Sequence, residues 1–130
     1  MLEIKGENII VTRGNYMPLV ISTKNPVDGT DYIFQIDDVI RFKVFEKGKV
    51  DNVILEKDFK VNAPSIEIDI NIDAEEMKIG ELINKPKDYW YEIELNPDTP
   101  ITQTIIGYDK DKGAAILTLL PEGGDNDDKG

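Results

Sequence analysis

The stretch Ser65-Ile66-Glu67-Ile68-Asp69-Ile70-Asn71-Ile72 decides the fold class, because isoleucine stands at every second position with a polar or acidic residue between. Successive side chains of a β-strand point to opposite faces, so this period of two puts all four isoleucines on one face of a sheet and the polar residues in water. A helix would scatter the isoleucines around its circumference. The stretch therefore predicts a strand with one buried and one solvated face.

Short alternating runs of the same kind lie on both sides of this strand and are separated by turn residues. Because proline cannot donate to a ladder, Pro18 marks its run as an edge strand or a bulge. In the run 53–61, Val53, Leu55 and Phe59 are expected to share one face. Together the runs predict strands at residues 3–5, 8–12, 16–23, 33–36, 39–46, 53–61, 89–95, 101–106 and 115–120.

Residues 73–83 lose the period of two. Asp73 can cap Ala74-Glu75-Glu76-Met77, with acids in the first turn where the helix dipole favours them, so one short helix is expected here. Many short strands at this spacing predict an all-β antiparallel β-sandwich of about 7–9 strands with one short helical crossover, and an open barrel is the alternative. We expect the domain to span residues 1–121 and residues 122–130 to form an acidic flexible tail.

Composition excludes several functions. The chain has 130 residues, 26 acidic and 15 basic, and its formal charge of −11 would repel nucleic-acid backbones and anionic membrane surfaces. The absence of cysteine and histidine removes thiol chemistry, the commonest general base and the commonest metal ligand. The N-terminus lacks the basic and apolar regions of a signal peptide. We therefore expect no nucleic-acid or membrane partner, no metal, no cofactor, and synthesis in a cytoplasm without a signal peptide.

Candidate chemistry is sparse. The run Asp109-Lys110-Asp111-Lys112-Gly113 lacks the glycine and the glutamate that a calcium loop needs at fixed positions, so a hairpin turn is expected. The neighbouring carboxylates of Asp37-Asp38 and Glu75-Glu76 would point to opposite faces of a strand and do not form an acid/base pair. No catalytic residue is predicted, and the chain is expected not to be an enzyme.

The aromatic run around Trp90 provides the main interface candidates. If Tyr89, Tyr91, Ile93 and Leu95 face the core, Trp90 faces outward; the alternative is a buried tryptophan with the tyrosines at the rim. Packing between sheets and an exposed anchor at a protein interface both fit a tryptophan here. A turn is the simpler reading of Arg13-Gly14-Asn15. The interface candidates are Arg13, Asn15, Tyr16, Tyr89, Trp90 and Tyr91.

The order of these segments resembles the opening immunoglobulin-like domain of upper baseplate and tail proteins from phages and prophages of low-GC Gram-positive bacteria. The resemblance covers roughly residues 1–122, and its motifs are loose. This chain has Arg13-Gly14-Asn15 where the family usually has Arg-Gly-Asp, and Lys87-Asp88 where many members have a glycine. The segments that carry it are Val11 to Asn15, Ile36 to Val44, the isoleucine strand with Asp73 to Met77, Asp88 to Leu95, Thr104 to Asp109 and Leu117 to Glu122.

The resemblance implies an immunoglobulin-like β-sandwich that serves as a non-enzymatic structural or adaptor component of a tail or baseplate particle. Its partners would be other tail or baseplate proteins, with a homo-oligomer as an open alternative, and its location would be the virion or tail particle. One competing hypothesis is a carbohydrate-binding module of a bacterial or phage surface that stacks sugars on Tyr89, Trp90, Tyr91 or Tyr32. Another is a carboxylate-only glycoside hydrolase, for which the sequence selects no pair of acids.

Overall fold

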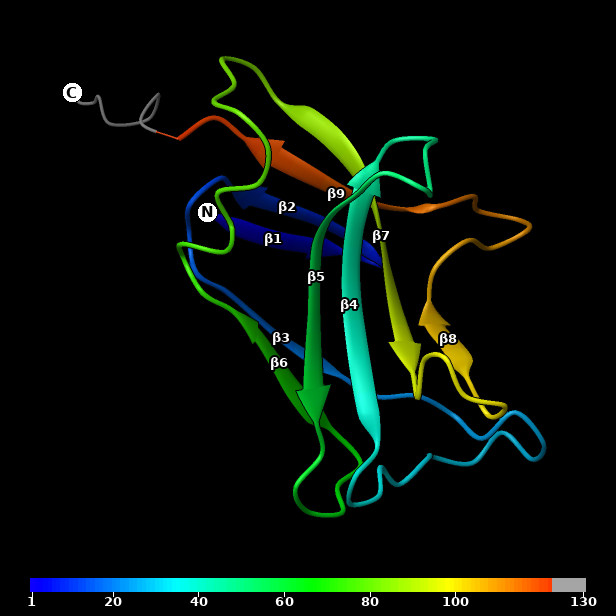
Figure 1. Ribbon diagram of the computed structural model, residues 1–130. Coiled ribbons are helices and arrows are strands. Elements are labelled where there is room, and N and C mark those ends of the chain that lie inside the picture. The colour runs from blue at the N-terminus through cyan, green and yellow to red at the C-terminus, as the bar shows by residue number, and fades with distance from the viewer. Residues whose placement is uncertain (123–130) are drawn as a thin grey trace.

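The computed structural model describes residues 1–122, which form nine β-strands and no helix (Figure 1). Within this range no helix is long and apolar enough to cross a membrane. The predicted all-β class and number of strands are confirmed. The strands are β1 (Leu2–Lys5), β2 (Asn8–Thr12), β3 (Met17–Ile21), β4 (Val39–Glu46), β5 (Val53–Lys60), β6 (Ile68–Ile72), β7 (Lys87–Leu95), β8 (Gln103–Ile106) and β9 (Ala115–Leu120).

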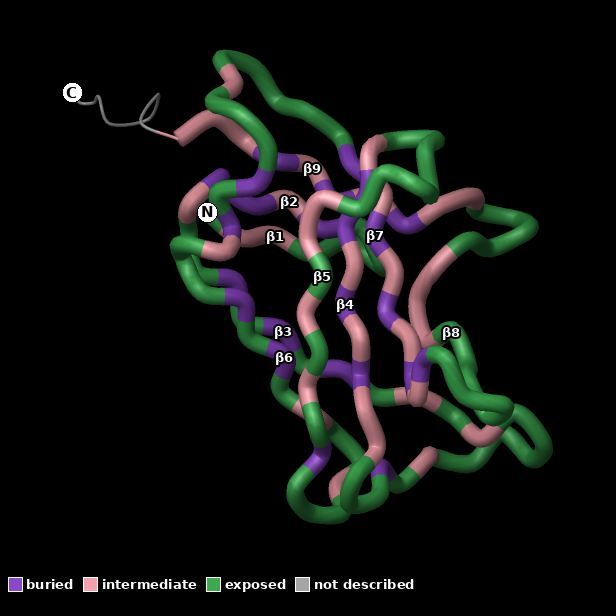
Figure 2. Tube along the Cα trace, in the orientation of Figure 1, coloured by how far each residue is buried: buried purple, intermediate pink, exposed green. Residues whose placement is uncertain are grey.

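The strands form two sheets of unequal size. The larger sheet has the order β1-β2-β9-β7-β4-β5, and β8 pairs with the last part of β7; β3 and β6 form the smaller sheet. Figure 2 shows buried residues alternating with partly buried ones along β4, β7 and β9, as expected for strands with one face on a core. The outward direction of Arg41 and Lys43 and the inward direction of Phe42 follow the same alternation.

One strand pair departs from the antiparallel expectation. β2 and β9 are parallel, with Ile9 opposite Leu117 and Thr12 opposite Leu120, whereas every other strand pair is antiparallel among the described residues. β2 returns from a hairpin with β1 and lies beside the last strand, running in the same direction. The larger sheet is therefore mixed.

The isoleucine strand is shorter than its pattern suggests. Ile70 and Ile72 are fully buried and Ile68 is partly buried, but Ile66 precedes the strand and is 47% exposed. The reason is local. The hydroxyl of Ser65 donates to the Glu67 carbonyl at 2.6 Å and accepts from the Glu67 N–H at 3.2 Å, a compact turn that keeps Ile66 off the ladder.

The expected helix at Asp73 is wrong, although its cap is present. The Glu76 N–H donates to the Asp73 carboxylate at 2.8 Å, the Glu76 carboxylate accepts from the Asp73 N–H at 3.1 Å, and one turn closes from the Met77 N–H to the Asp73 carbonyl. The next turn does not form, because the Met77 carbonyl accepts from the Gly14 N–H at 3.0 Å. Met77, the last residue of this turn, and Ile79 after it are buried in the core.

Two edge features follow from the pairing. β3, which contains Pro18, pairs only with β6 among the described strands, so it is an edge strand as predicted. The expected strand at 33–36 is reduced to a single bridge between Phe34 and Ser65. Phe34 is nevertheless fully buried, because this bridge holds the loop against the end of the core.

Gly80 lies in the segment that replaces the helix, and we expect its replacement by alanine to be costly. Its φ is +62°, and an added Cβ would lie 2.8 Å from the hydroxyl of Tyr89, a ring that is only 1% exposed and has no room to move. Gly48 has a similar φ of +76° with open space around it. Urea denaturation should show Gly80→Ala more destabilising than Gly48→Ala by about 1 kcal/mol or more.

The Tyr89→Phe background separates the clash from backbone strain. Removing the hydroxyl should reduce the cost of Gly80→Ala to that of Gly48→Ala, because only the positive φ then remains. An unchanged cost in this background would contradict the clash as the cause.

Candidate functional site

An apolar row crosses four strands on the outer face of the larger sheet. Phe45 of β4 lies opposite both Val53 of β5 and Trp90 of β7, and Trp90 lies opposite Ile116 of β9. We call these four residues the outer row. Phe45 is 5% exposed, yet it is outside the main core cluster, because its neighbours on the outer face cover it. Trp90 and Ile116 are half-buried, and Val53 is 40% exposed.

A β-bulge places Val53 in this row. Val44 pairs with Leu55 but Phe45 pairs with Val53, so the register shifts by one residue at Ile54. The sequence pattern predicts Val53 on the same face as Leu55, and that prediction is wrong for this physical reason. The shift completes the apolar row at the β5 edge of the sheet.

Polar side chains border the outer row on both sides. On one side, Lys43 lies 3.6 Å from the carboxylate of Glu92 and 3.2 Å from that of Glu94, across the β4–β7 pair. On the other side, the hydroxyl of Thr118 donates to the carboxylate of Asp88 at 2.7 Å. The row is therefore an apolar strip with a polar rim.

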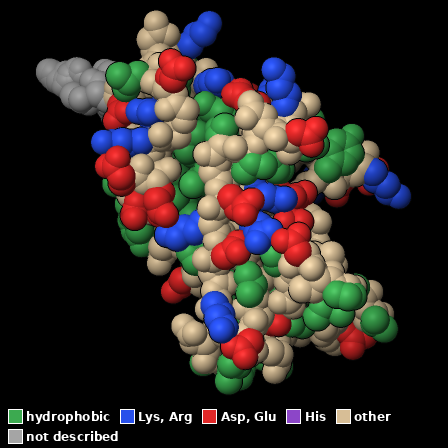
Figure 3. All heavy atoms as spheres, in the orientation of Figure 1, with side chains coloured by type: hydrophobic (Ala, Val, Ile, Leu, Met, Phe, Trp, Pro, Cys, Tyr) green, Lys and Arg blue, Asp and Glu red, His purple; other side chains and the backbone are tan. Residues whose placement is uncertain are grey.

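Arg41 extends the rim. Its Nε and Nη2 donate to the Asp58 carboxylate at 2.8 and 3.0 Å, and its Nη1 donates to Asp98 at 2.9 Å. These hydrogen bonds from Arg41 hold the pKa of Asp58 below its ordinary value. Figure 3 shows acidic and basic side chains interleaved over the middle of β4, β5 and β7. The charges on this face are thus largely matched to one another.

The aromatic strand has the orientation expected if the tyrosines face the core. Tyr89 and Tyr91 point inward and are 1% and 3% exposed, while Trp90 points outward. The Tyr91 hydroxyl donates to the Glu7 carbonyl, and burial raises the pKa of Tyr91. Both tyrosines are interface candidates by sequence, but their side chains are not available at the surface. Trp90 alone remains from this run.

Arg13 is also buried, at 8% exposure, and its guanidinium joins the segment around Gly80 and Glu122 to the turn after β2. Nε donates to the Ile79 carbonyl at 2.8 Å, Nη2 donates to the Gly80 carbonyl at 2.7 Å, and Nη1 pairs with the Glu122 carboxylate. Glu122, assigned to the tail by sequence, is thereby tied to the domain; the rest of the predicted tail lies outside the described residues. Sequence offers no signal for these contacts, because the carbonyls lie 66 and 67 residues away.

Asn15 and Tyr16 lie on the turn between β2 and β3, and both are exposed, Tyr16 at 53%. The turn itself is confirmed by the hydrogen bond from the Asn15 N–H to the Thr12 carbonyl at 3.0 Å. The predicted interface residues therefore do not form one site. The outer row joins Trp90 to residues that the sequence does not single out.

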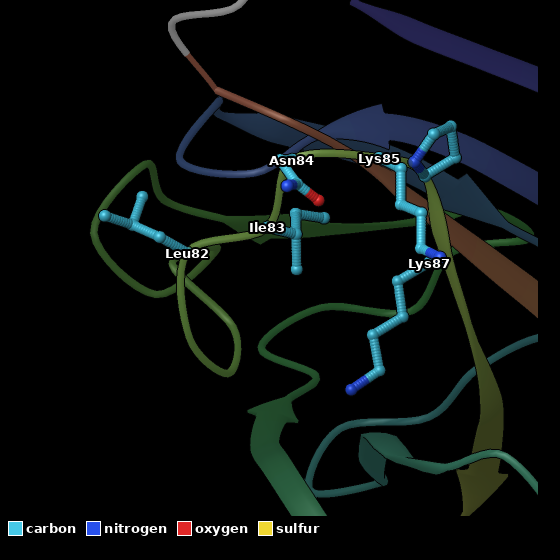
Figure 4. A pocket seen from close by; sticks show the side chains of 6 residues that line it. Leu82, Ile83, Asn84, Lys85 and Lys87 are labelled. Atoms are coloured by element: carbon cyan, nitrogen blue, oxygen red, sulfur yellow. The ribbon is translucent and has the colours of Figure 1, made fainter.

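The hollow in Figure 4 lies just before and at the start of β7, and no carboxylate lines it. It has a volume of about 450 Å³ and is lined by the loop residues Leu82 to Pro86 and by Lys87 at the start of β7. The carboxyl groups with shifted pKa are Asp28, Asp38, Asp58 and Asp109, and each pKa is lowered, which is opposite to what a general acid needs.

Asp109 forms the expected hairpin turn. Its carboxylate accepts from the Asp111 N–H at 2.7 Å and from the Lys112 N–H at 3.1 Å, and its backbone is bridged to Gly113. Among residues 1–122, no cluster of three acidic side chains has a geometry that could hold a metal ion.

A second polar centre, at Asp38, joins loops at one end of the molecule. Its carboxylate accepts from the Tyr32 hydroxyl at 2.7 Å, the Gln35 N–H at 2.9 Å and the Asn96 side-chain amide at 3.1 Å. Partial burial acts to raise the pKa of Asp38, but the three hydrogen bonds outweigh it, and the pKa lies below the ordinary value. Burial also raises the pKa of Tyr32 to about 12.

The lowered pKa of Asp38 predicts a pH-dependent stability contribution. This contribution is complete above the ordinary carboxyl pKa of about 4 and is lost as the pH falls through the lower pKa of the folded state. We expect Asp38→Asn to lose about 1 kcal/mol at neutral pH and less in acid, as measured by urea denaturation across pH. Asp69→Asn, at an exposed position of β6, is the control substitution and should change the free energy of unfolding little at neutral pH. An Asp38→Asn loss that stays constant across pH would contradict the linkage.

Comparison of the chain with models of protein families, with curated proteins and with solved structures gave no match.

Proposed function

We propose that this chain is a non-enzymatic, immunoglobulin-like adaptor of a phage or prophage tail or baseplate particle, and that it binds a partner protein through the outer row. The observation that carries the binding proposal is the outer row itself: Trp90 at the centre of an apolar strip with a polar rim. Tryptophan is enriched among the residues that dominate protein interfaces, and a surrounding rim excludes water from it.

The strand order supports the immunoglobulin-like topology. If β3, β4, β5, β6, β7 and β9 correspond to strands B, C, C′, E, F and G, one sheet contains G-F-C-C′ and the other contains B-E. Tyr89 near the start of β7 places its hydroxyl against Gly80, at the corner between β6 and β7, which is similar to the tyrosine corner of that fold. The chain departs from antibody domains in having no cysteine.

The outer row favours a protein partner over a sugar. A carbohydrate platform needs at least two exposed aromatic rings on one face, and here Tyr89 and Tyr91 are buried on the inner side while Phe45 is 5% exposed. In the outer row, Trp90 instead lies between the nearly buried Phe45 and the aliphatic Ile116, and Val53 lies beyond Phe45. An aliphatic and aromatic strip with a charged rim has the composition of a protein interface.

The phage context rests on the resemblance in segment order. A tail or baseplate is a symmetric particle, so a modest contact at one outer row would be repeated around the ring and would hold the assembly through avidity. The formal charge of −11 fits an external adaptor better than a component that contacts packaged DNA.

Co-expression with the products of neighbouring tail genes tests the proposal. We expect one of them to form a complex of defined stoichiometry with the chain, as measured by size-exclusion chromatography with light scattering. A chain that stays monomeric with each of these products would contradict an adaptor function.

A further inference from the structure

Three loops form one end of the molecule, and we call them the loop end: residues 22–38, 61–67 and 96–102. The loops are joined by backbone hydrogen bonds. Phe34 and Ser65 exchange two, at 2.8 and 3.2 Å, and the Asn96 N–H donates at 2.7 Å to the carbonyl of Val39, the β4 residue that directly follows the first loop. The Asp38 carboxylate adds side-chain bonds to the first and third loops. The loop end is therefore cross-linked by hydrogen bonds rather than a set of independent loops.

Aliphatic side chains project from this end. These side chains are 47% to 95% exposed, so most of their apolar surface is not used in packing against the protein's own core. Figure 3 shows hydrophobic side chains at the lower right and the lower tip, where Figure 1 places these loops. The exposed residues are Val27, Ile33, Ile36, Ile66 and Ile101.

Ile33 and Ile66 form the best-defined part of this surface. They flank the bridge between Phe34 and Ser65 in antiparallel register, so they lie opposite each other, and they are 50% and 47% exposed. Phe34 beneath them is fully buried, and its ring packs edge-to-face on that of Tyr32, with 5.2 Å between the ring centroids. Two exposed isoleucines on such a fixed base contribute little to folding, whereas they suit docking of an apolar partner.

The loop end is also strongly acidic. Its three loops contain six acidic residues and one lysine, a formal charge of −5 out of −11 for the whole chain. Lys24 is paired with Asp31. Two cations from the adjoining strands, Lys60 and Arg41, pair with Asp37 and Asp98. Within residues 1–122, Asp28 and Glu67 have no ion pair. A second copy of this end or an anionic lipid surface would be repelled.

We propose that the loop end is a docking surface for a cationic amphipathic protein segment, with aliphatic residues that cover Ile33 and Ile66 and basic residues that face the surrounding acids. This surface is separate from the outer row and does not depend on it. Together, two docking surfaces would let the chain bridge two partners.

A peptide titration tests this surface without knowledge of the natural partner. The probe is a short peptide of alternating leucine and lysine, and its binding is followed by NMR of the ¹⁵N-labelled protein. The two control peptides alternate leucine with glutamate and serine with lysine. We expect shifts confined to the three loops with the first peptide only, and weaker binding when salt rises from about 0.05 to about 0.5 M. Equal binding of the serine–lysine peptide, shifts outside the loops, or no binding would overturn the proposal.

Paired variants make the test specific. Ile33→Ser with Ile66→Ser should weaken the peptide by about 10-fold, whereas Val50→Ser with Leu82→Ser, which changes two exposed aliphatic residues on other loops, should leave it unchanged. Equal effects of the two pairs would contradict a site at Ile33 and Ile66. The wild-type chain should not co-sediment with neutral phosphatidylcholine vesicles. If it does, and if Ile33→Ser with Ile66→Ser abolishes this binding, the loop end binds a lipid surface and the proposal is overturned.

Discussion

Trp90→Ser is expected to weaken binding to the proposed partner protein by about 30-fold or more, because a central tryptophan at an interface commonly contributes about 2 kcal/mol or more. The side chain is half-buried on the outer face and has Phe45 and Ile116 as cross-strand neighbours. Isothermal titration with the partner found by co-expression measures the change.

One control variant and one further test variant separate an effect on docking from an effect on folding. Tyr108→Ser removes a 73% exposed aromatic on the segment between β8 and β9, outside the outer row, and should leave the affinity unchanged. Val53→Lys places a charge at the exposed end of the outer row and should weaken binding without lowering the melting temperature substantially. If Trp90→Ser and Val53→Lys both bind as tightly as the wild type, the outer row is not the interface.

Arg13→Met is expected to lower the free energy of unfolding by roughly 3 kcal/mol. The change leaves the Ile79 and Gly80 carbonyls without their donor and removes the ion pair to Glu122. A buried acceptor such as the Ile79 carbonyl costs about 1–3 kcal/mol when it is left unpaired, and the partly buried Gly80 carbonyl and the ion pair add smaller losses. Methionine retains most of the apolar volume. Chemical denaturation monitored by circular dichroism measures the loss.

Arg41→Met is the matched control. Arg41 also has several partners, but its carboxylates lie on a solvated face, where ion pairs contribute about 0–1 kcal/mol. We therefore expect its effect to be well below that of Arg13→Met. Equal losses for the two variants would show that the buried carbonyl contacts of Arg13 contribute nothing beyond a surface ion pair.

Alternation along single strands predicted much of the fold. The inward and outward positions of β4 follow from a period of two, and in β7 the structure selects the alternative in which the tyrosines face the core and Trp90 faces outward. These predictions succeed because one face of each strand packs on a continuous core, which makes the register costly to change.

Features that depend on contacts distant in sequence were not predictable. The helix at Asp73 has a correct local cap, but a hydrogen bond from Gly14 to Met77 ends it. The sequence predicts Arg13 in a surface turn, yet its side chain is buried and donates hydrogen bonds to the carbonyls of Ile79 and Gly80. In each case a tertiary contact outweighs a local preference.

Only part of the candidate site could be predicted from the sequence. Trp90 could be singled out as a possible anchor, whereas the outer row requires the pairing of four strands and the bulge at Ile54 that turns Val53 outward. The loop end required knowledge that residues 33 and 66 face each other across one bridge. Register between strands is the information that a single sequence lacks.

Trp90 is the only tryptophan of the chain, which allows the docking face to be observed directly. The chain labelled with 5-fluorotryptophan gives one ¹⁹F resonance, and it can be mixed with the unlabelled partner protein identified by co-expression. Docking at the outer row predicts that this resonance shifts and loses its sensitivity to solvent when the complex forms. An unchanged resonance in a stoichiometric complex would contradict docking at the outer row.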